Sequence, residues 1–167
     1  MYYSDIKPND VINGKGICVS LFVSGCENYC EDCFNKETWN FNYGQKFTNK
    51  NMDYILECIP KNNTMRNFSV LGGEPLHKKN IITVLEILKE VKNEYPNITT
   101  YVWTGYLFED LLKEYEKYIF KDIDILIDGK FEKDKKDLRL KLRGSSNQRV
   151  IDIQKTLKED KVIEIIQ

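Results

Sequence analysis

The chain has 167 residues, of which 41% are hydrophobic and 12% aromatic, with 25 basic and 26 acidic side chains. This composition is typical of a globular protein and excludes a disordered one. Since the charges nearly cancel, no general attraction to nucleic acid or to an anionic membrane is expected. The N-terminal residues contain no apolar run and no basic leader, and no stretch approaches the about 18 apolar residues of a membrane-spanning helix. We therefore expect one cytoplasmic domain over residues 1–167.

Strands and helices alternate along the chain. In chain order we predict a strand over 14–25, a helix over 48–61, a strand over 66–73, a helix over 80–91, a strand over 97–105, a helix over 106–118, a strand over 122–129 and short strands over 148–153 and 161–166. The strand segments are apolar and rich in β-branched residues, and the helix over 80–91 repeats apolar residues at the spacing of one helix face. This alternation predicts an α/β fold with a mainly parallel sheet.

Unusual residues follow four of the predicted strands. A cysteine-rich run follows the first, Gly-Gly-Glu-Pro the second, Thr-Gly the third and Asp-Gly the fourth. Sites in parallel α/β folds form at the carboxyl ends of strands. We therefore expect all these residues on one rim of the sheet.

Three of the five cysteines, Cys26, Cys30 and Cys33, lie close together in the sequence. In a reducing compartment, clustered cysteines indicate metal or redox chemistry more often than a disulfide. A redox pair formed by Cys30 and Cys33 is a weak interpretation, because the acidic residues beside them would raise the thiol pKa and Cys26 would have no role.

A structural zinc ion is a second interpretation, and it requires a fourth ligand. The candidates are Cys18, Cys58 and His77. We expect Cys18 and Cys58 to be small buried residues of a strand and a helix, and His77 to be a partly exposed residue at a helix start. Zinc stays possible without a convincing fourth ligand.

An iron–sulfur cluster is the third interpretation. A [4Fe–4S] cluster normally takes four thiolates, so three would leave one iron open to another ligand. The carboxylates near the cysteines would help to hold such a cluster at a low reduction potential.

The Cys-x3-Cys-x2-Cys run after the first strand resembles the motif of radical S-adenosylmethionine enzymes, and the "LGGEP" run resembles their glycine-rich motif. Further segments resemble the subfamily that activates anaerobic ribonucleoside-triphosphate reductase, and the likeness spans nearly the whole chain. These segments are 10–26, 33–39, 72–77, 103–106, 128–131 and 143–149.

The resemblance implies a shortened, open (β/α) barrel, one [4Fe–4S] cluster held by Cys26, Cys30 and Cys33, and S-adenosylmethionine bound at the open iron. It also implies that the enzyme forms a glycyl radical on the reductase, with a low-potential electron donor such as a flavodoxin or ferredoxin. The three cysteines would carry the catalysis through the cluster.

The resemblance also implies the contacts of S-adenosylmethionine. Its adenine side would lie near Asp32, Cys33 and Phe34, although many radical enzymes have an aromatic residue where this chain has Asp32. Its methionyl group would meet Gly72, Gly73 and Glu74, with Glu74 accepting a hydrogen bond from the ammonium group. Thr104 would reach the ribose or the methionine carboxylate.

The run over 129–149 carries eight basic and three acidic residues. Charge runs of this kind are usually solvated loops, and apart from Phe131 no aromatic residue interleaves the charges to stack on nucleic-acid bases. The subfamily resemblance suggests a docking surface for the reductase or a cover for the cofactor.

Two other functions stay open at this point. One is the activation of a different glycyl-radical enzyme. The other is a zinc-stabilised binding protein without catalysis, which would leave the Gly-Gly-Glu-Pro and Trp-Thr-Gly-Tyr runs without an explanation.

Overall fold

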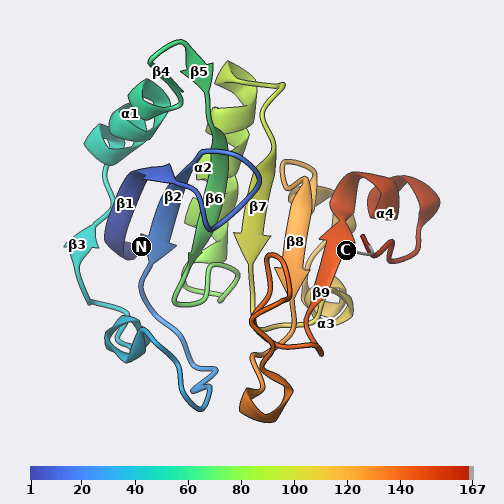
Figure 1. Ribbon diagram of the computed structural model, residues 1–167. Helices are drawn as coiled ribbons and strands as arrows, with labels where there is room; N and C mark the ends of the chain where they lie inside the picture. The colour runs from blue at the N-terminus through green and yellow to red at the C-terminus, as the bar shows by residue number, and fades with distance from the viewer. Residues whose placement is uncertain (166–167) are drawn as a thin grey trace.

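A mixed sheet forms the centre of the molecule, and its middle four strands are parallel. The computed structural model describes residues 1–165. The strand order is β3-β1-β2-β6-β7-β8-β9, with β2, β6, β7 and β8 parallel and the remaining three strands antiparallel to their neighbours (Figure 1). The strands are β1 Tyr2–Asp10, β2 Cys18–Val23, β3 Gln45–Lys46, β6 Asn67–Gly72, β7 Thr100–Trp103, β8 Ile125–Asp128 and β9 Arg149–Asp152. A separate hairpin pairs β4 Pro60–Lys61 with β5 Thr64–Met65.

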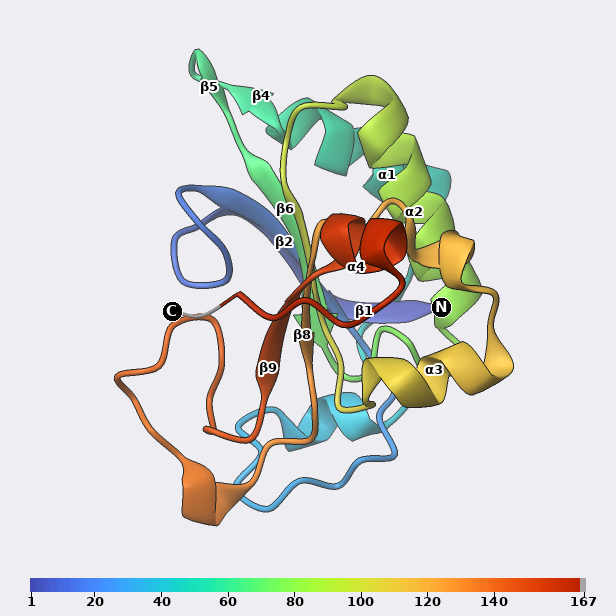
Figure 2. The same cartoon turned by 90° about the vertical axis from the view of Figure 1, so that its right-hand side faces the viewer.

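The helices cover one face of this sheet. They are α1 Asn49–Cys58, α2 Ile81–Glu94, α3 Phe108–Glu114 and α4 Ile153–Glu159, with short 3-10 turns at Lys36–Trp39, Lys117–Phe120 and Lys133–Lys135. Seen along the sheet edge, the other face is approached by two loops, one after β1 and one between β8 and β9 (Figure 2). The two faces therefore differ, since one has helices and the other has irregular segments.

The main core lies between the sheet and the helices. β2 is buried at every position because its other face is covered as well. Gly14, in the loop after β1, approaches the Cys18, Ser69 and Tyr101 side chains of that face so closely that a Cβ atom there would not fit. A smaller apolar cluster on this side contains Tyr101, Ile127 and Val150.

The expected mainly parallel α/β fold is confirmed. The parallel pairing puts the carboxyl ends of β2, β6, β7 and β8 at one edge of the sheet, which confirms the predicted rim. Helix α1 begins after Thr48, whose backbone N–H donates to Asn51 Oδ1 at 2.8 Å, and ends before Pro60 as expected.

Several predicted boundaries were wrong. The third helix is shorter than 106–118, since α3 ends at Glu114 and a 3-10 turn follows. No strand covers 161–165, where Glu164 forms an isolated bridge to Ile151; residue 166 of that predicted strand lies outside the described residues.

Among the elements of seven or more residues, two had no counterpart in the sequence prediction. β1 carries Asp5 and Lys7, and its place near the sheet edge exposes both side chains to water. α4 forms where a predicted strand ends, and its N-terminal backbone is capped by Asp152, which accepts from Lys155 N at 3.0 Å. Within residues 1–165, no helix is both long enough and apolar enough to cross a membrane.

Candidate functional site

The cysteine loop, residues 24–35, leaves the carboxyl end of β2 and is closed at its base. Gly25 N donates to Thr38 O at 2.7 Å, and Cys26 N donates to Trp39 O at 3.2 Å. The returning 3-10 turn thus pairs with the start of the loop. Between these ends, Tyr29 and Asp32 adopt positive φ angles of 47° and 58°, which let the chain turn tightly.

All three cysteines of this loop are free thiols. Cys26 is buried at 7% exposure, whereas Cys30 and Cys33 are partly exposed. Cys33 N donates to Cys30 O at 3.2 Å, so these two residues share one turn. The loop therefore presents one sulfur to the protein interior and two toward the surface.

Burial disfavours thiolates in this loop when no metal is bound. It raises the pKa of Cys26 to about 11, although Asn28 N, at 3.5 Å from Cys26 Sγ, opposes the shift. Burial also raises the pKa of Cys30, and the positive charge of Lys130 opposes it. Iron binds thiolates, so a cluster held by these side chains would displace their protons.

The donor set suits a cluster better than a zinc ion. Cys18 is fully buried in β2 and Cys58 is buried in α1, as the sequence suggested. Within residues 1–165, no three cysteine, histidine or carboxylate side chains are grouped as ligands of one metal ion. Three thiols on one loop, two of them accessible, would suit three irons of a [4Fe–4S] cluster and leave the fourth iron open to another ligand.

His77 was expected to be partly exposed, and this expectation was wrong. It is 2% exposed because the Phe41 ring lies against it, with ring centroids 4.6 Å apart. Its Nε2 lies 3.3 Å from Glu27 Oε2, while Nδ1 accepts a hydrogen bond from Lys79 N at 3.2 Å. His77 therefore supports the residue beside Cys26 and has no free nitrogen to offer a metal.

The glycine turn after β6 packs directly on the start of the cysteine loop. Gly73 N donates to Val23 O, and Glu74 N donates to Gly25 O, both at 2.8 Å. A Cβ atom on Gly72, whose φ is 108°, would lie 2.8 Å from Val23 O, and one on Gly73 would lie 2.7 Å from Gly25 O. Any larger residue at these two positions would push the turn away from the cysteine loop.

Glu74 is the centre of a buried hydrogen-bond network. Its side chain is 0% exposed, and each carboxylate oxygen accepts two hydrogen bonds. The donors are Leu76 N at 3.1 Å and Thr104 Oγ1 at 2.7 Å to Oε1, and Asn28 Nδ2 at 2.8 Å and Gly105 N at 2.7 Å to Oε2. Burial raises the pKa of Glu74, and the hydrogen bonds oppose this shift.

This network joins three parts of the rim. Asn28 belongs to the cysteine loop, Glu74 to the glycine turn, and Thr104 and Gly105 to the end of β7. A Cβ atom on Gly105 would overlap the Asn28 side chain, so the glycine makes room for this contact. Thr104 directs its hydroxyl to Glu74 and accepts from Tyr106 N at 3.1 Å.

The end of β8 is tied to β9 and α3 by charged groups. Buried Asp128 accepts hydrogen bonds from Arg149 Nε and from Phe108 N, both at 2.9 Å. Arg149 also donates from Nη1 to Glu109 Oε1 at 2.9 Å. The hydrogen bonds to Glu109 and Asp128 raise the pKa of Arg149 well above its usual range. Asp128 of the Asp-Gly run and Arg149 at the end of segment 143–149 thus link the end of β8 to β9 and to α3.

Sequence reasoning missed Asn28 and Lys133. Lys133 Nζ lies 2.9 Å from Glu31 Oε1 and 3.2 Å from Asp32 Oδ2, which brings the segment between β8 and β9 against the cysteine loop. No local sequence pattern identifies either contact. By contrast Phe34, expected near the adenine, is 88% exposed.

Comparison with known proteins identifies the family. Residues 12–151 match the family described as "4Fe-4S single cluster domain". The chain is 41% identical to the anaerobic ribonucleoside-triphosphate reductase-activating protein of Pasteurella multocida, over 89% of this chain and 95% of the relative. It belongs to this family of activating proteins.

Other activating proteins of the family are similarly close. The protein of Escherichia coli K12 is 40% identical over 89% of this chain and 96% of its own length, and that of enterobacteria phage T4 is 39% identical over 90% and 93%. The resemblance stated from the sequence motifs is therefore confirmed.

Proposed function

We propose that this chain is a radical S-adenosylmethionine activase that generates a glycyl radical on anaerobic ribonucleoside-triphosphate reductase. The observation that carries the proposal is the packing of the glycine turn 72–74 on a loop with three free cysteines. The names of the relatives support the reductase as the substrate. In this proposal residues 1–167 act as a single domain whose sheet is a shortened, open barrel.

Cys26, Cys30 and Cys33 are the proposed ligands of the cluster. Bound together, the cluster and S-adenosylmethionine supply a one-electron reductive cleavage that yields methionine and 5′-deoxyadenosine, with the hydrogen atom taken from a glycine of the reductase. The protein contributes placement and exclusion of water. A flavodoxin or a ferredoxin is the proposed electron donor.

The glycine turn is the proposed site of the methionyl group. Gly72 and Gly73 are partly exposed, and their lack of a side chain lets the turn pack on the backbone of Val23 and Gly25. Glu74 already accepts four hydrogen bonds, which is about the capacity of a carboxylate. We therefore expect it to attract the ammonium group of S-adenosylmethionine by its negative charge more than by a further hydrogen bond. Thr104 donates a hydrogen bond to that carboxylate. Its hydroxyl oxygen is the polar atom that we propose lies on the side of the ribose.

The exposed residues of the cysteine loop are proposed to meet the adenine side. Phe34 offers an aromatic ring that is free of contacts with the core, and Asp32 and Cys33 offer backbone groups beside it. The sheet face without helices is the proposed entrance for the reductase.

The decisive experiment measures the cleavage reaction. The protein is reconstituted anaerobically with iron and sulfide, reduced with photoreduced deazaflavin and mixed with S-adenosylmethionine, and 5′-deoxyadenosine is quantified by chromatography. We expect product from the wild type and from Cys58→Ala, whose cysteine is buried in α1, and none from Cys30→Ala.

Addition of the reductase identifies the substrate. A glycyl radical detected by electron paramagnetic resonance on the reductase supports the proposed partner. Product formation with no such radical would indicate a different glycyl-radical enzyme. A protein that carries a reducible cluster and forms no product would exclude the activase.

A further inference from the structure

The segment between β8 and β9, residues 129–149 and here called the basic segment, forms a preshaped surface. Gln148 Oε1 accepts from Gly144 N at 2.9 Å and from Ser145 N at 3.2 Å. Gln148 Nε2 donates to Gly129 O at 3.0 Å, and Asn147 Nδ2 donates to Lys130 O at 2.8 Å. These hydrogen bonds link the two ends of the segment, so the segment has a defined conformation outside the sheet.

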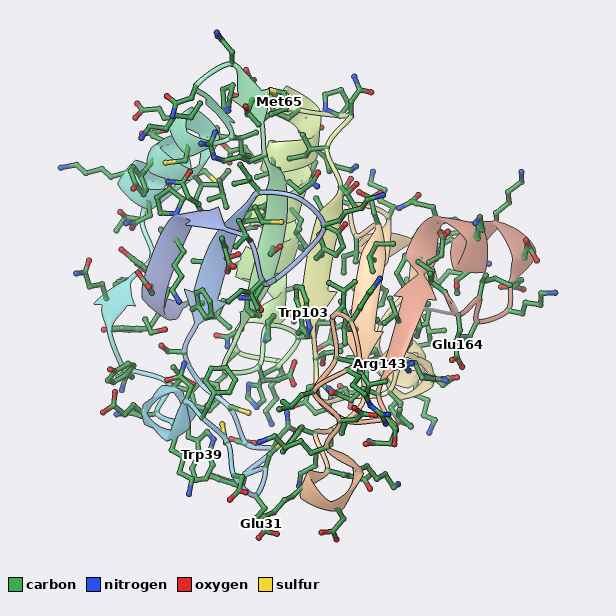
Figure 3. All side chains as sticks on the ribbon, viewed as in Figure 1. Glu31, Trp39, Met65, Trp103, Arg143 and Glu164 are labelled. Carbon is green, nitrogen blue, oxygen red and sulfur yellow. The ribbon has the colours of Figure 1, made fainter. Side chains whose placement is uncertain are left out.

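The basic segment lies beside the cysteine loop. In two perpendicular views its 3-10 turn, Lys133–Lys135, lies at the same end of the molecule as the cysteine loop, and the rest of the segment runs back over the sheet face (Figures 1 and 2). Glu31 projects from the cysteine loop at that end (Figure 3), and Lys133 pairs with it and with Asp32. A molecule that docks on the basic segment therefore comes close to the proposed cluster ligands.

Several positive charges of the basic segment have no ionic partner. Of its three acidic residues, Glu132 pairs with Lys135 at 2.7 Å and Asp137 with Arg139 at 2.8 Å, whereas Asp134 is in no ion pair of the described residues. The carboxylates of the cysteine loop nearest to it are paired with Lys133. Among residues 1–165, no ion pair includes Lys130, Lys136 or Lys141, and all three side chains are exposed.

Large apolar side chains are exposed on the cysteine loop and on the basic segment. Phe34 of the cysteine loop is 88% exposed and Leu138 of the basic segment is 89% exposed. Large exposed apolar groups flanked by charge are typical of protein-binding surfaces.

We propose that the basic segment is the docking surface for an acidic one-electron donor protein that reduces the cluster. This inference rests on the proposed function, since it presumes a reducible cluster. One electron passes from the reduced flavin or iron–sulfur centre of the donor to the oxidised cluster, and no bond forms or breaks. The donor is oxidised by one electron and the cluster is reduced by one.

Charge complementarity favours this partner. Unpaired lysines steer an acidic protein to the part of the surface nearest to the cluster ligands, and such steering accelerates encounter without a large interface. Complexes of redox proteins are typically small and transient. A surface with a few lysines and two exposed apolar residues fits that description better than it fits a permanent interface.

The test compares two double variants with the same change in charge. Lys136→Glu/Lys141→Glu alters the basic segment, and Lys50→Glu/Lys89→Glu alters exposed positions on α1 and α2. Stopped-flow absorbance measures the anaerobic reduction of the reconstituted cluster by an acidic reduced flavodoxin at several salt concentrations. We expect the first variant to react at least about tenfold more slowly at low salt and to depend less on salt, and the second to change less than about twofold.

A small reductant separates this inference from the proposed function. Photoreduced deazaflavin should reduce the cluster and support 5′-deoxyadenosine formation equally in the wild type and both variants. A wild type that forms no 5′-deoxyadenosine with deazaflavin contradicts the proposed function, whatever the flavodoxin rates are.

Two outcomes would overturn the docking surface. One is an equal reduction rate by flavodoxin in the wild type and the Lys136→Glu/Lys141→Glu variant. The other is a loss of reductase binding in that variant with an unchanged flavodoxin rate, which would assign the surface to the reductase.

Discussion

Asn28 Nδ2 donates a 2.8 Å hydrogen bond to Glu74 Oε2, across 46 positions of sequence. Asn28 lies between the first two cysteines of the loop, and Glu74 follows the two glycines of the neighbouring turn. The bond therefore couples the position of the proposed cluster ligands to the position of the proposed methionyl site. Because Glu74 is buried, the bond is shielded from water and competes with no solvent.

Asn28→Ala should loosen the cysteine loop. The substitution removes one of four donors to a buried carboxylate, and we expect it to destabilise the protein by about 1–3 kcal/mol and to lower the iron content after reconstitution. Urea unfolding of the iron-free protein and iron analysis check the two effects. An unchanged iron content would show that the loop keeps its shape without this bond.

Gly105→Ala should act through the same contact. Its new methyl group overlaps the Asn28 side chain, so we expect a loss of stability of about 1–3 kcal/mol. In the Asn28→Ala background the overlap disappears, and Gly105→Ala should then cost much less. Equal costs in both backgrounds would mean that the glycine is required for another reason.

Asp128→Asn and Glu109→Gln should differ strongly although both remove a partner of Arg149. Asp128 is buried and also accepts a backbone hydrogen bond, so its loss should cost about 3 kcal/mol. Glu109 is half-exposed, and its loss should cost at most about 1 kcal/mol. Chemical denaturation at neutral pH measures both, and similar costs would contradict the structural ranking.

Glu109 should also contribute to stability in a pH-dependent way. The hydrogen bond from Arg149 holds the pKa of Glu109 below its usual range, so the folded protein binds a proton there less readily than the unfolded chain. This contribution is present above the ordinary glutamate pKa and is lost as the pH falls through the lowered value. In Glu109→Gln that loss on the acid side should be absent, as denaturation at a series of pH values would show.

Phe34→Ala should separate binding from stability. Since Phe34 is almost fully exposed, we expect the free energy of unfolding to change by less than about 0.5 kcal/mol. The affinity of the reconstituted protein for S-adenosylmethionine should fall several-fold, about the value of one aromatic contact. Anaerobic calorimetry measures the affinity, with Tyr118→Ala, an exposed aromatic on a distant turn, as control. An affinity equal to that of the control would remove Phe34 from the proposed cofactor site.

The α/β class, the parallel strands and the shared rim were predictable because they depend on local patterns. Short apolar runs in the sequence predict buried strands, and apolar residues repeated at helical spacing predict amphipathic helices. The edge strand β1 and the short helix α4 were missed because neither has a strong pattern. β1 alternates mostly half-buried and exposed residues and includes three charged ones, and α4 has seven residues.

The cysteines and the glycine turn were also visible in the sequence, since few other roles explain such residues at such a spacing. His77, Asn28 and Lys133 were not. Each depends on a residue that is distant in the chain, and Lys133 lies 102 positions from Glu31. Burial of His77 follows from the approach of Phe41, which no periodicity encodes.

The sequence by itself determined the kind of chemistry this protein can hold, because thiols, glycines and carboxylates keep their reactivity and conformational freedom wherever the chain places them. The tertiary structure alone decided how those groups are arranged. It brought four strand ends together, closed the network around Glu74 and laid the basic segment beside the cysteine loop. The physical reason is that hydrogen bonds and ion pairs act over a few ångströms, and only the folded sheet brings distant parts of the chain within that range.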